Sequence, residues 1–301
     1  MSLYDIVIIG GGPAGLTAAV YAGRANKKSL VIEKGTFGGQ ITSSPKVENI
    51  PGFESVTGNE FAEKLIAQAM GLDAEIECCQ VQKIIPGKPH TVVTDEGEFQ
   101  AKAVIIATGT KHRLLGLEKE EEFIGNGISF CAVCDGAFYE DKTVAVIGGG
   151  NSALQEAILL SETCKKVYVV QNLDYLTGEE KLQKVLETKA NVEVILGNVV
   201  EKLLGDVEFE GIIISGKEGK TELKLDGMFT AIGLLPQNEA FADVVKLNDY
   251  GYVDADEDCI TSADGIFVAG DCRRKRIRQV ATAAADGAVA ALAACSYIDS
   301  Y

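Results

Sequence analysis

The chain has 301 residues, 47% of them hydrophobic, and a formal net charge of −16. This length suggests two domains with sizeable cores, and the negative charge disfavours nucleic acid and anionic membrane surfaces as partners. No uninterrupted apolar run reaches about 18 residues, the length of a membrane span, and no signal-peptide pattern precedes Leu3. We therefore expect a cytoplasmic protein.

A strand–turn–helix–strand unit opens the chain. An apolar strand over 3–9 leads into a glycine-rich turn, a helical pattern to about Asn26, and a second strand over 30–32 that ends at Glu33. The G-x-G-x-x-G spacing lets the backbone approach a pyrophosphate at the helix N-terminus, and the acid can bond a ribose diol. The pattern predicts a dinucleotide site with Gly10, Gly12, Pro13, Ala14, Gly15 and Glu33.

A cysteine pair follows in mid-chain, as Cys131-Ala-Val-Cys134, with Asp135 next to it. This spacing allows a small disulfide ring and favours a thiolate nucleophile, whose proton Asp135 can move. The alternative is a structural zinc site, which needs four ligands. The sequence has no second C-x-x-C and only two His residues, so a redox pair is favoured and no metal is expected. The lone residues Cys164, Cys259, Cys272 and Cys295 are interpreted as small buried hydrophobes.

The opening arrangement recurs after this pair. A strand over 143–147, a second glycine-rich turn, a helix to about Cys164 and a strand over 167–170 form another unit of the same design. Two such units predict an α/β fold with two Rossmann-like nucleotide-binding domains. The second predicted nucleotide site comprises Gly148, Gly150, Asn151, Ser152 and Ala153.

The residue after the second strand of such a unit selects the nucleotide. An acid there binds the ribose of NAD, and basic residues bind the 2′-phosphate of NADP. Here the position is Gln171, and the nearest acid, Asp174, comes three residues late. Two interpretations stay open: Lys165, Lys166 or another lysine supplies the charge, or this domain does not bind a pyridine nucleotide productively.

The C-terminal part reads as a completion of the first domain. Residues 265–271 form a buried strand that ends in a loop with Asp271, and an Ala-rich helix follows at about 281–297. The second domain is then an insertion. We expect residues 1–113 and 238–301 to form the first domain and 114–237 the inserted one, with hinges at 113–117 and 234–238.

A basic cluster stands out in this acidic chain. It comprises Arg273, Arg274, Lys275, Arg276 and Arg278. The favoured interpretation is a solvated loop, with Arg278 serving the bound cofactor. The alternative is a dock for an acidic protein such as a ferredoxin, guided by local charge.

Taken in order, these motifs resemble low-molecular-weight thioredoxin reductase, from about Leu3 to Leu292. The motifs that carry the resemblance are 10–15, Gly38-Gly39-Gln40-Ile41, Val47-Glu48-Asn49, Ala107-Thr108-Gly109, 131–135, 148–153, Gly270-Asp271 and Arg278-Gln279-Val280.

The resemblance implies a homodimeric FAD enzyme that reduces thioredoxin. It implies that Cys134 lies against the flavin, that Cys131 attacks the thioredoxin disulfide, that Asp135 is the acid–base, and that the inserted domain rotates between two states. It adds further cofactor-binding residues: Gly39, Gln40, Asn49, Val81, Ala107, Thr108, Gly109, Gly270, Asp271, Arg278, Gln279 and Val280.

One departure from the family concerns the electron donor. Members that use NADPH carry His-Arg-Arg-x-x-x-Arg after the second strand, and here Gln171, Asn172, Leu173 and Thr177 replace all four residues. Relatives without this motif take electrons from ferredoxin or a deazaflavin. The resemblance implies NAD(P)H as donor, and the departure leaves ferredoxin or another donor as an alternative.

Two other functions are compatible with parts of the pattern. A ferredoxin–NADP-type oxidoreductase would keep the flavin without thiol chemistry, but the Cys131–Cys134 pair and the missing phosphate motif argue against it. A non-enzymatic flavoprotein redox sensor would signal to a partner protein. Rapid thioredoxin reduction by the artificially reduced protein would exclude the sensor.

Overall fold

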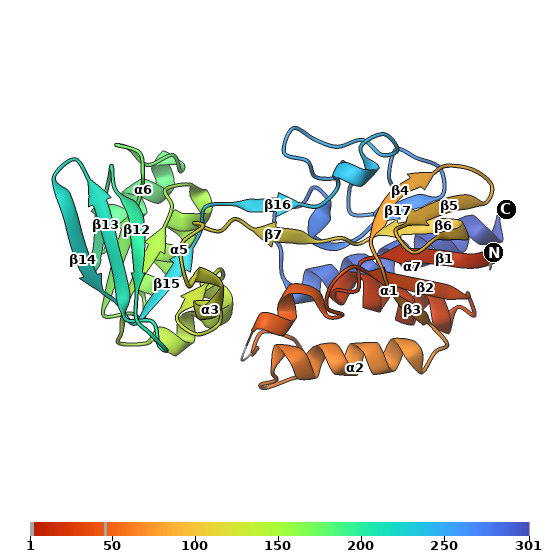
Figure 1. Cartoon of the computed structure of the whole chain (residues 1–301), viewed down its shortest axis with the longest axis horizontal. Coiled ribbons are helices and arrows are strands. Elements are labelled where there is room, and N and C mark those ends of the chain that lie inside the picture. The colour runs from red at the N-terminus through yellow and green to blue at the C-terminus, as the bar shows by residue number, and fades with distance from the viewer. Residues whose placement is uncertain (1–2, 45–46, 301) are drawn as a thin grey trace. The chain divides into compact units, whose positions relative to one another are not determined.

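The computed structural model describes residues 3–44 and 47–300 and divides into two compact units. Unit 1 comprises Met1–Lys111 and Leu235–Tyr301, and unit 2 comprises His112–Leu234 (Figure 1). The junctions expected from the sequence, at 113–114 and 237–238, lie within three residues of these. Both ends of the chain build unit 1, and unit 2 interrupts it.

Unit 1 contains a mixed sheet with helices packed against it. Its elements are β1 (Leu3–Ile9), α1 (Pro13–Arg24), β2 (Ser29–Glu33), the 3-10 helix η1 (Gly39–Ser43), α2 (Gly58–Met70), β3 (Glu75–Cys78), β4 (Val81–Ile85), β5 (His90–Thr94), β6 (Glu98–Ile106), η3 (Glu239–Phe241), β17 (Ile266–Val268), η4 (Gly270–Cys272) and α7 (Val280–Asp299).

The order of strands brings the carboxyl ends of β1, β2, β6 and β17 to one edge. The sheet runs β3-β2-β1-β6-β5-β4, with β17 also paired to β6. β1 is parallel to β2 and β6, and β6 is parallel to β17. Nucleotides bind at such an edge, where the strand order reverses. The fold therefore places the first glycine turn, Ala107 and Asp271 along the same edge.

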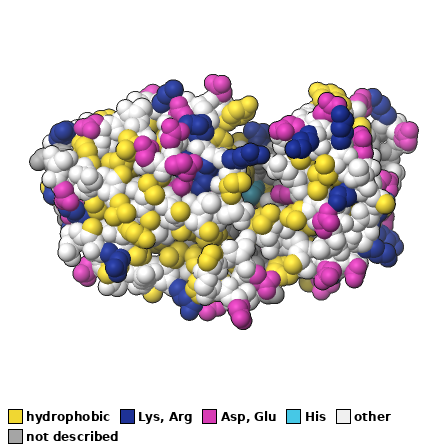
Figure 2. All heavy atoms as spheres, turned by 180° about the vertical axis from the view of Figure 1, so that it is seen from behind, with side chains coloured by type: hydrophobic (Ala, Val, Ile, Leu, Met, Phe, Trp, Pro, Cys, Tyr) yellow, Lys and Arg dark blue, Asp and Glu magenta, His cyan; other side chains and the backbone are white. Residues whose placement is uncertain are grey.

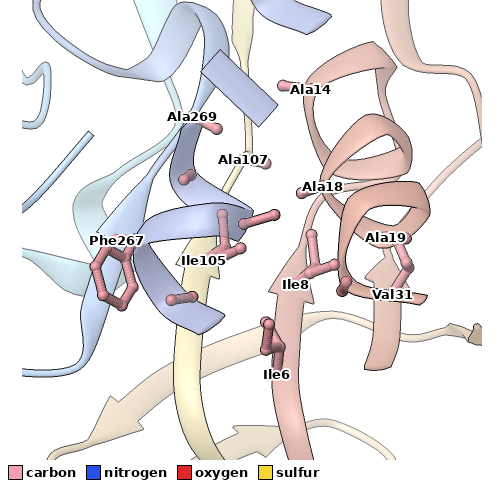
Figure 3. Close-up of a cluster of buried hydrophobic side chains, with 14 of the residues drawn as sticks. Ile6, Ile8, Ala14, Ala18, Ala19, Val31, Ile105, Ala107, Phe267 and Ala269 are labelled. Atoms are coloured by element: carbon pink, nitrogen blue, oxygen red, sulfur yellow. The ribbon is translucent and has the colours of Figure 1, made fainter. Parts of the chain in front are cut away.

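The core of unit 1 lies between this sheet and helices α1 and α7. Figure 3 shows Ile6 and Ile8 from β1 and Ile105 from β6 in one cluster with Ala18 from α1, and all four are fully buried. A Cβ on Gly287 would lie 2.2 Å from the Ala14 carbonyl oxygen. Only glycine permits that approach, so small residues hold α7 tightly against α1.

Helix α7 is long and apolar enough to cross a membrane by length and composition alone, although Asp286 interrupts its apolar run. Its buried face, which includes Ala290, Ala291 and Ala294, belongs to the core cluster around α1. We therefore assign α7 as a core helix of unit 1.

Unit 2 repeats the strand–turn–helix design and adds an antiparallel sheet. Its elements are α3 (Glu120–Phe123), β8 (Ile128–Ser129), α4 (Ala132–Asp135), η2 (Gly136–Tyr139), β9 (Thr143–Ile147), α5 (Asn151–Ser161), β10 (Lys166–Val170), α6 (Glu180–Glu187), β11 (Val192–Ile195), β12 (Val199–Leu204), β13 (Gly211–Gly216), β14 (Gly219–Lys224) and β15 (Gly227–Thr230).

The main sheet of unit 2 is parallel and runs β11-β10-β9-β15-β8. Its central strands are fully buried at Val144, Val146, Val167 and Val169, as expected for strands covered on both faces. The two Rossmann-like units inferred from the sequence are confirmed.

The chain crosses between the units twice, and the two crossings run side by side. β7 (Thr110–His112) pairs with β16 (Leu234–Pro236), and the Arg113 amide donates to the Gly233 carbonyl at 3.0 Å. The segment that enters unit 2 and the segment that leaves it therefore form one two-stranded ribbon.

Candidate active site

The first glycine-rich turn joins β1 to α1, and its glycines have different structural roles. A Cβ on Gly10, at φ +116°, would lie 2.2 Å from the Ala107 oxygen, and one on Gly15 would lie 1.9 Å from the Gly10 oxygen. These two glycines allow close packing. A Cβ on Gly12, the N-cap of α1, would meet nothing closer than 3.9 Å. This open approach to a helix N-terminus suits a pyrophosphate.

Glu33 ends β2 beside this turn. Its carboxylate accepts hydrogen bonds from the amides of Gly11, at 2.8 Å, and Gly35, at 2.9 Å. Residue 11 needs to be glycine, because a Cβ there would lie 2.6 Å from the Phe37 ring and 3.0 Å from the Glu33 Cβ. The acid is therefore fixed where a nucleotide ribose would lie.

Several other predicted site residues gather around the same turn. A Cβ on Gly39 would lie 3.2 Å from the Gly12 Cα, and a Cβ on Gly270 would lie 2.8 Å from the Ala14 Cβ. Pro13 occupies the first turn of α1.

The remaining residues predicted to bind the cofactor lie in neighbouring loops of unit 1. The Thr108 hydroxyl donates to Asn238, the Gln40 amide donates to the Thr110 carbonyl, and Asn49 donates to the Gln279 side chain at 3.2 Å. Gly109 has φ +65°, and Gln279 and Val280 cap and begin α7. Val81 begins β4, three residues after Cys78, which pairs in register with Glu33.

Asp271, in η4, supplies an unsatisfied acceptor near this turn. Its Oδ1 is buried and has no hydrogen-bond partner, and burial raises the pKa of its carboxyl. Arg278 lies over the Tyr252 ring at 4.4 Å and donates to the Asp271 carbonyl at 3.4 Å. A buried acceptor is costly without a donor. The open approach at Gly12, the anchored Glu33 and this acceptor together fit a dinucleotide with a hydroxyl-bearing chain, as in FAD.

In unit 2, Cys131 and Cys134 form a disulfide, with Cα atoms 5.3 Å apart. Cys131 precedes the short helix α4, and Cys134 lies inside it. Helical spacing brings residues three apart to the same side, which allows the small ring. The Cys131 amide donates to the Ser129 hydroxyl at 3.1 Å, so strand β8 anchors the start of the motif.

Asp135 is held beside this disulfide. The Ser129 hydroxyl donates to its Oδ2 at 2.6 Å, and its Oδ1 is buried without a hydrogen-bond partner. Burial raises the pKa of Asp135, and the Ser129 hydrogen bond partly offsets this effect. A carboxyl group with a raised pKa can store a proton for a leaving thiolate. Sequence reasoning missed Ser129, although a hydroxyl two positions before the C-x-x-C was a usable signal.

The second glycine-rich turn reproduces the geometry of the first. A Cβ on Gly148, at φ +130°, would lie 2.6 Å from the Ala231 oxygen, and Gly150 is the N-cap of α5. Ser152 is exposed and Ala153 is fully buried in α5. The Asn151 side chain donates to Glu179 at 2.8 Å and accepts from the Glu179 amide at 2.7 Å.

The side chain that follows β10 differs in chemistry from Glu33. Gln171 is 5% exposed, and a Cβ on Gly149 would lie 2.5 Å from its Nε2. Its side-chain oxygen accepts from the Asn172 amide at 3.1 Å, and its nitrogen lies 3.4 Å from the Tyr175 carbonyl. A neutral amide folded onto its own turn therefore occupies the nucleotide-selecting position.

The lysines considered as substitutes lie elsewhere. Lys166 begins β10, at the opposite end of the strand from Gln171, and its ammonium pairs with Glu193 at 2.8 Å. A strand advances about 3.3 Å per residue, so Lys165 and Lys166 are more than about 12 Å along the strand from the selecting position.

The basic cluster after Asp271 differs from both interpretations offered above. The side chains of Arg273 and Lys275 are only 2% and 4% exposed and pair with Asp286, while Arg274 pairs with Asp254 and Asp256. The solvated-loop interpretation is therefore wrong for Arg273 and Lys275. The docking interpretation is weakened, because three of the five basic residues, Arg273, Arg274 and Lys275, already form ion pairs within the chain.

Comparison with known proteins agrees with this geometry. The sequence profile of the family described as pyridine nucleotide-disulphide oxidoreductase matches residues 4–287. A Clostridium pasteurianum protein described as "34.2 kDa protein in rubredoxin operon" is 41% identical over 98% of this chain and 97% of its own length. A thioredoxin reductase from Listeria innocua is 39% identical over 99% of this chain and 94% of its own length. The crystal structure of thioredoxin reductase from Streptococcus pyogenes matches with a TM-score of 0.94 and 39% identity, over 99% of each chain.

Proposed function

We propose that this chain, which belongs to the pyridine nucleotide-disulphide oxidoreductase family and is an enzyme of the thioredoxin reductase type, passes electrons through FAD and Cys131–Cys134 to thioredoxin. The observation that carries the proposal is the Cys131–Cys134 disulfide, next to which Ser129 bonds both the Cys131 amide and the Asp135 carboxylate. The relatives named thioredoxin reductase support thioredoxin as the substrate.

The proposed chemistry is thiol–disulfide exchange. FAD, when bound, would supply the electron pair that reduces Cys131–Cys134 to a dithiol. The Cys131 thiolate then attacks one sulfur of the thioredoxin disulfide, and a mixed disulfide forms as that bond breaks. The Cys134 thiolate attacks the Cys131 sulfur, restores the disulfide and releases the reduced thioredoxin. Asp135 would protonate the departing thiolate, a role that its raised pKa supports.

FAD would be held by unit 1. The first glycine turn with Gly12 would receive the pyrophosphate, Glu33 the adenosine ribose, and Asp271 a hydroxyl of the ribityl chain. The residues of the loops around Gly39, Asn49, Val81, Thr108 and Gln279 would complete the contacts. Unit 2, with Gly148 to Ala153, would bind a pyridine nucleotide if one is the donor.

The electron donor is a separate part of the proposal. The family description supports NAD(P)H. A second candidate, ferredoxin or another donor without a 2′-phosphate, is favoured by the neutral Gln171 at the selecting position. A low-potential ferredoxin near −400 mV would reduce a thioredoxin disulfide near −270 mV with about 6 kcal/mol released for two electrons.

A homodimer in the cytoplasm completes the proposal. Figure 2 shows hydrophobic side chains gathered over the face of unit 1 that it presents. Exposed apolar residues of that unit include Tyr21 of α1 and Val289 and Leu292 of α7. An apolar surface of this kind on a soluble protein is a common site of subunit contact. Sedimentation equilibrium of the holoprotein would test the dimer.

The decisive experiment is an anaerobic titration of the oxidised holoprotein with NADPH, NADH and reduced ferredoxin in turn. We expect the flavin absorbance to bleach with the true donor, and the reduced protein then to reduce a thioredoxin disulfide within seconds. Failure of the dithionite-reduced protein to reduce any thioredoxin would overturn the proposed enzyme and favour the redox sensor.

A further inference from the structure

The residues after Asp271 form a buried network of charges that the proposed mechanism does not use. Arg273 donates to both oxygens of the Asp286 carboxylate at 2.9 Å, and also to Glu257 at 2.8 Å. Lys275 donates to the Asp286 Oδ2 at 2.9 Å. Asp286, in the second turn of α7, therefore forms ion pairs with two cations of the preceding loop.

Asp286 also holds the turn that carries Asp271. Its Oδ2 accepts from the Gly270 amide at 3.0 Å. Gly270 lies against Ala14 in the first turn of α1, where a Cβ on Gly270 would be 2.8 Å from the Ala14 Cβ. The network thus fixes the Gly270–Asp271 turn against the N-terminus of α1, next to the proposed pyrophosphate position.

The two carboxylates in this cluster, Asp271 and Asp286, accept unequal numbers of hydrogen bonds. Asp286 receives four donor contacts. Burial would raise its pKa, but the hydrogen bonds and charges of Arg273 and Lys275 lower it. Asp271 has a buried Oδ1 with no hydrogen-bond partner, and its nearest ion-pair cation among the described residues is Lys275, at 3.8 Å. Lys275 bonds Asp286 directly and acts on Asp271 only through its charge. The Asp271 acceptor is thereby left available to a ligand.

We propose that Lys275 is a positioning residue for the flavin cofactor, which holds the Asp271 carboxyl group in place to accept a hydrogen bond from a cofactor hydroxyl. This inference rests on the proposed function, because it requires that unit 1 binds FAD. Burial raises the pKa of Asp271, and the charge of Asp286 adds to this effect. The charges of Lys275, Arg278 and Arg273 oppose it and favour the ionised form.

The test is the substitution Lys275→Met in the full-length holoprotein, compared with Lys275→Arg and with Arg274→Met. Methionine keeps the length and apolar stem of lysine but removes the charge. Arg274→Met removes a neighbouring cation that pairs with Asp254 and Asp256 and not with Asp271 or Asp286. The readout is the FAD dissociation constant, from the fluorescence of flavin released on serial dilution, measured from about pH 6 to about pH 8.

We expect Lys275→Met to weaken FAD binding about ten- to a hundredfold, the size of a lost charge-assisted contact. The loss should grow as the pH falls, because Asp271 without Lys275 takes up a proton more readily. Lys275→Arg should restore most of the affinity, and Arg274→Met should bind FAD like the unsubstituted protein. A purely structural role for Lys275 would lower thermal stability without this added dependence on pH.

A double-mutant cycle with Asp271→Asn is a second test of the inference, run with Lys275→Gln in place of Lys275→Met if the methionine variant is unstable. The loss caused by Lys275→Met should largely disappear in the Asp271→Asn background, because both changes remove the same interaction. Additive losses, or a pH-independent loss in Lys275→Met, would overturn the inference. An unsubstituted protein that binds no FAD would instead overturn the proposed function.

Discussion

The two glycine-rich turns have the same backbone geometry and different surroundings. In both, the first glycine lets a carbonyl from the neighbouring strand approach, at Ala107 in unit 1 and Ala231 in unit 2. In unit 1 the following strand ends in Glu33, which two amides fix in place, whereas in unit 2 the neutral Gln171 follows the strand. Close packing thus preserves a Rossmann turn whether or not its nucleotide contacts persist. The glycines therefore indicate the fold, and the side chain at the nucleotide-selecting position indicates which ligand binds.

The largest expected effect is the loss of disulfide chemistry in unit 2 while unit 1 still binds FAD. Cys134→Ser should lower thioredoxin turnover at least about a thousandfold, because the disulfide can no longer form. The variant should retain its bound FAD, since the proposed FAD contacts lie in unit 1. Cys164→Ser, at a free, buried cysteine of unit 2, is the control and should keep turnover. Normal turnover in Cys134→Ser would contradict the proposed mechanism.

A smaller loss is expected from the acid beside the disulfide. Asp135→Asn should reduce turnover about a hundredfold, the usual contribution of a general acid. Turnover that depends on protonated Asp135 falls as the pH rises through its pKa. Ser129→Ala removes the bond that lowers this raised pKa, so the falling limb should move to higher pH. An unshifted limb in Ser129→Ala would show that another group donates the proton.

The packing of the two turns gives a third contrast, measured by urea unfolding. Gly15→Ala would place a Cβ 1.9 Å from the Gly10 oxygen and should destabilise unit 1 by about 2 kcal/mol, with loss of FAD. The equivalent residue of unit 2 is already alanine. Ala153→Gly should cost only about 1 kcal/mol, from helix propensity. Equal costs in the two units would mean that the turns are packed alike.

The smallest effect should come from rebuilding a phosphate contact in unit 2. Asn172 and Thr177 are exposed, so Asn172→Arg with Thr177→Arg can be tolerated. The pair should tighten NADPH binding about tenfold while NADH binding stays nearly constant, because only NADPH carries the 2′-phosphate. Isothermal titration calorimetry with both nucleotides measures this. Parallel gains for NADH would indicate a general charge effect.

Local signals in the sequence predicted the parts of the molecule that depend on neighbouring residues. The glycine turns with their flanking strands and the Cys131–Cys134 spacing were of this kind, and both Rossmann-like units were inferred from them. The inward course of Arg273 and Lys275 was not predicted, because their partner Asp286 becomes visible only once α7 packs on the loop. The folded-back course of Gln171 was missed because its side chain packs against Gly149, which only the folded turn brings beside it.

The paired crossings β7 and β16 have a consequence for how the chain folds. Strands β6 and β17 are neighbours in unit 1, yet the whole of unit 2 separates them in sequence. Closing so long a flexible loop costs conformational entropy. Once unit 2 has folded, its two ends are held about 4.8 Å apart in the β7–β16 ribbon. The folded inserted unit then holds the two segments of unit 1 close together, which lowers the entropy cost of forming their shared sheet.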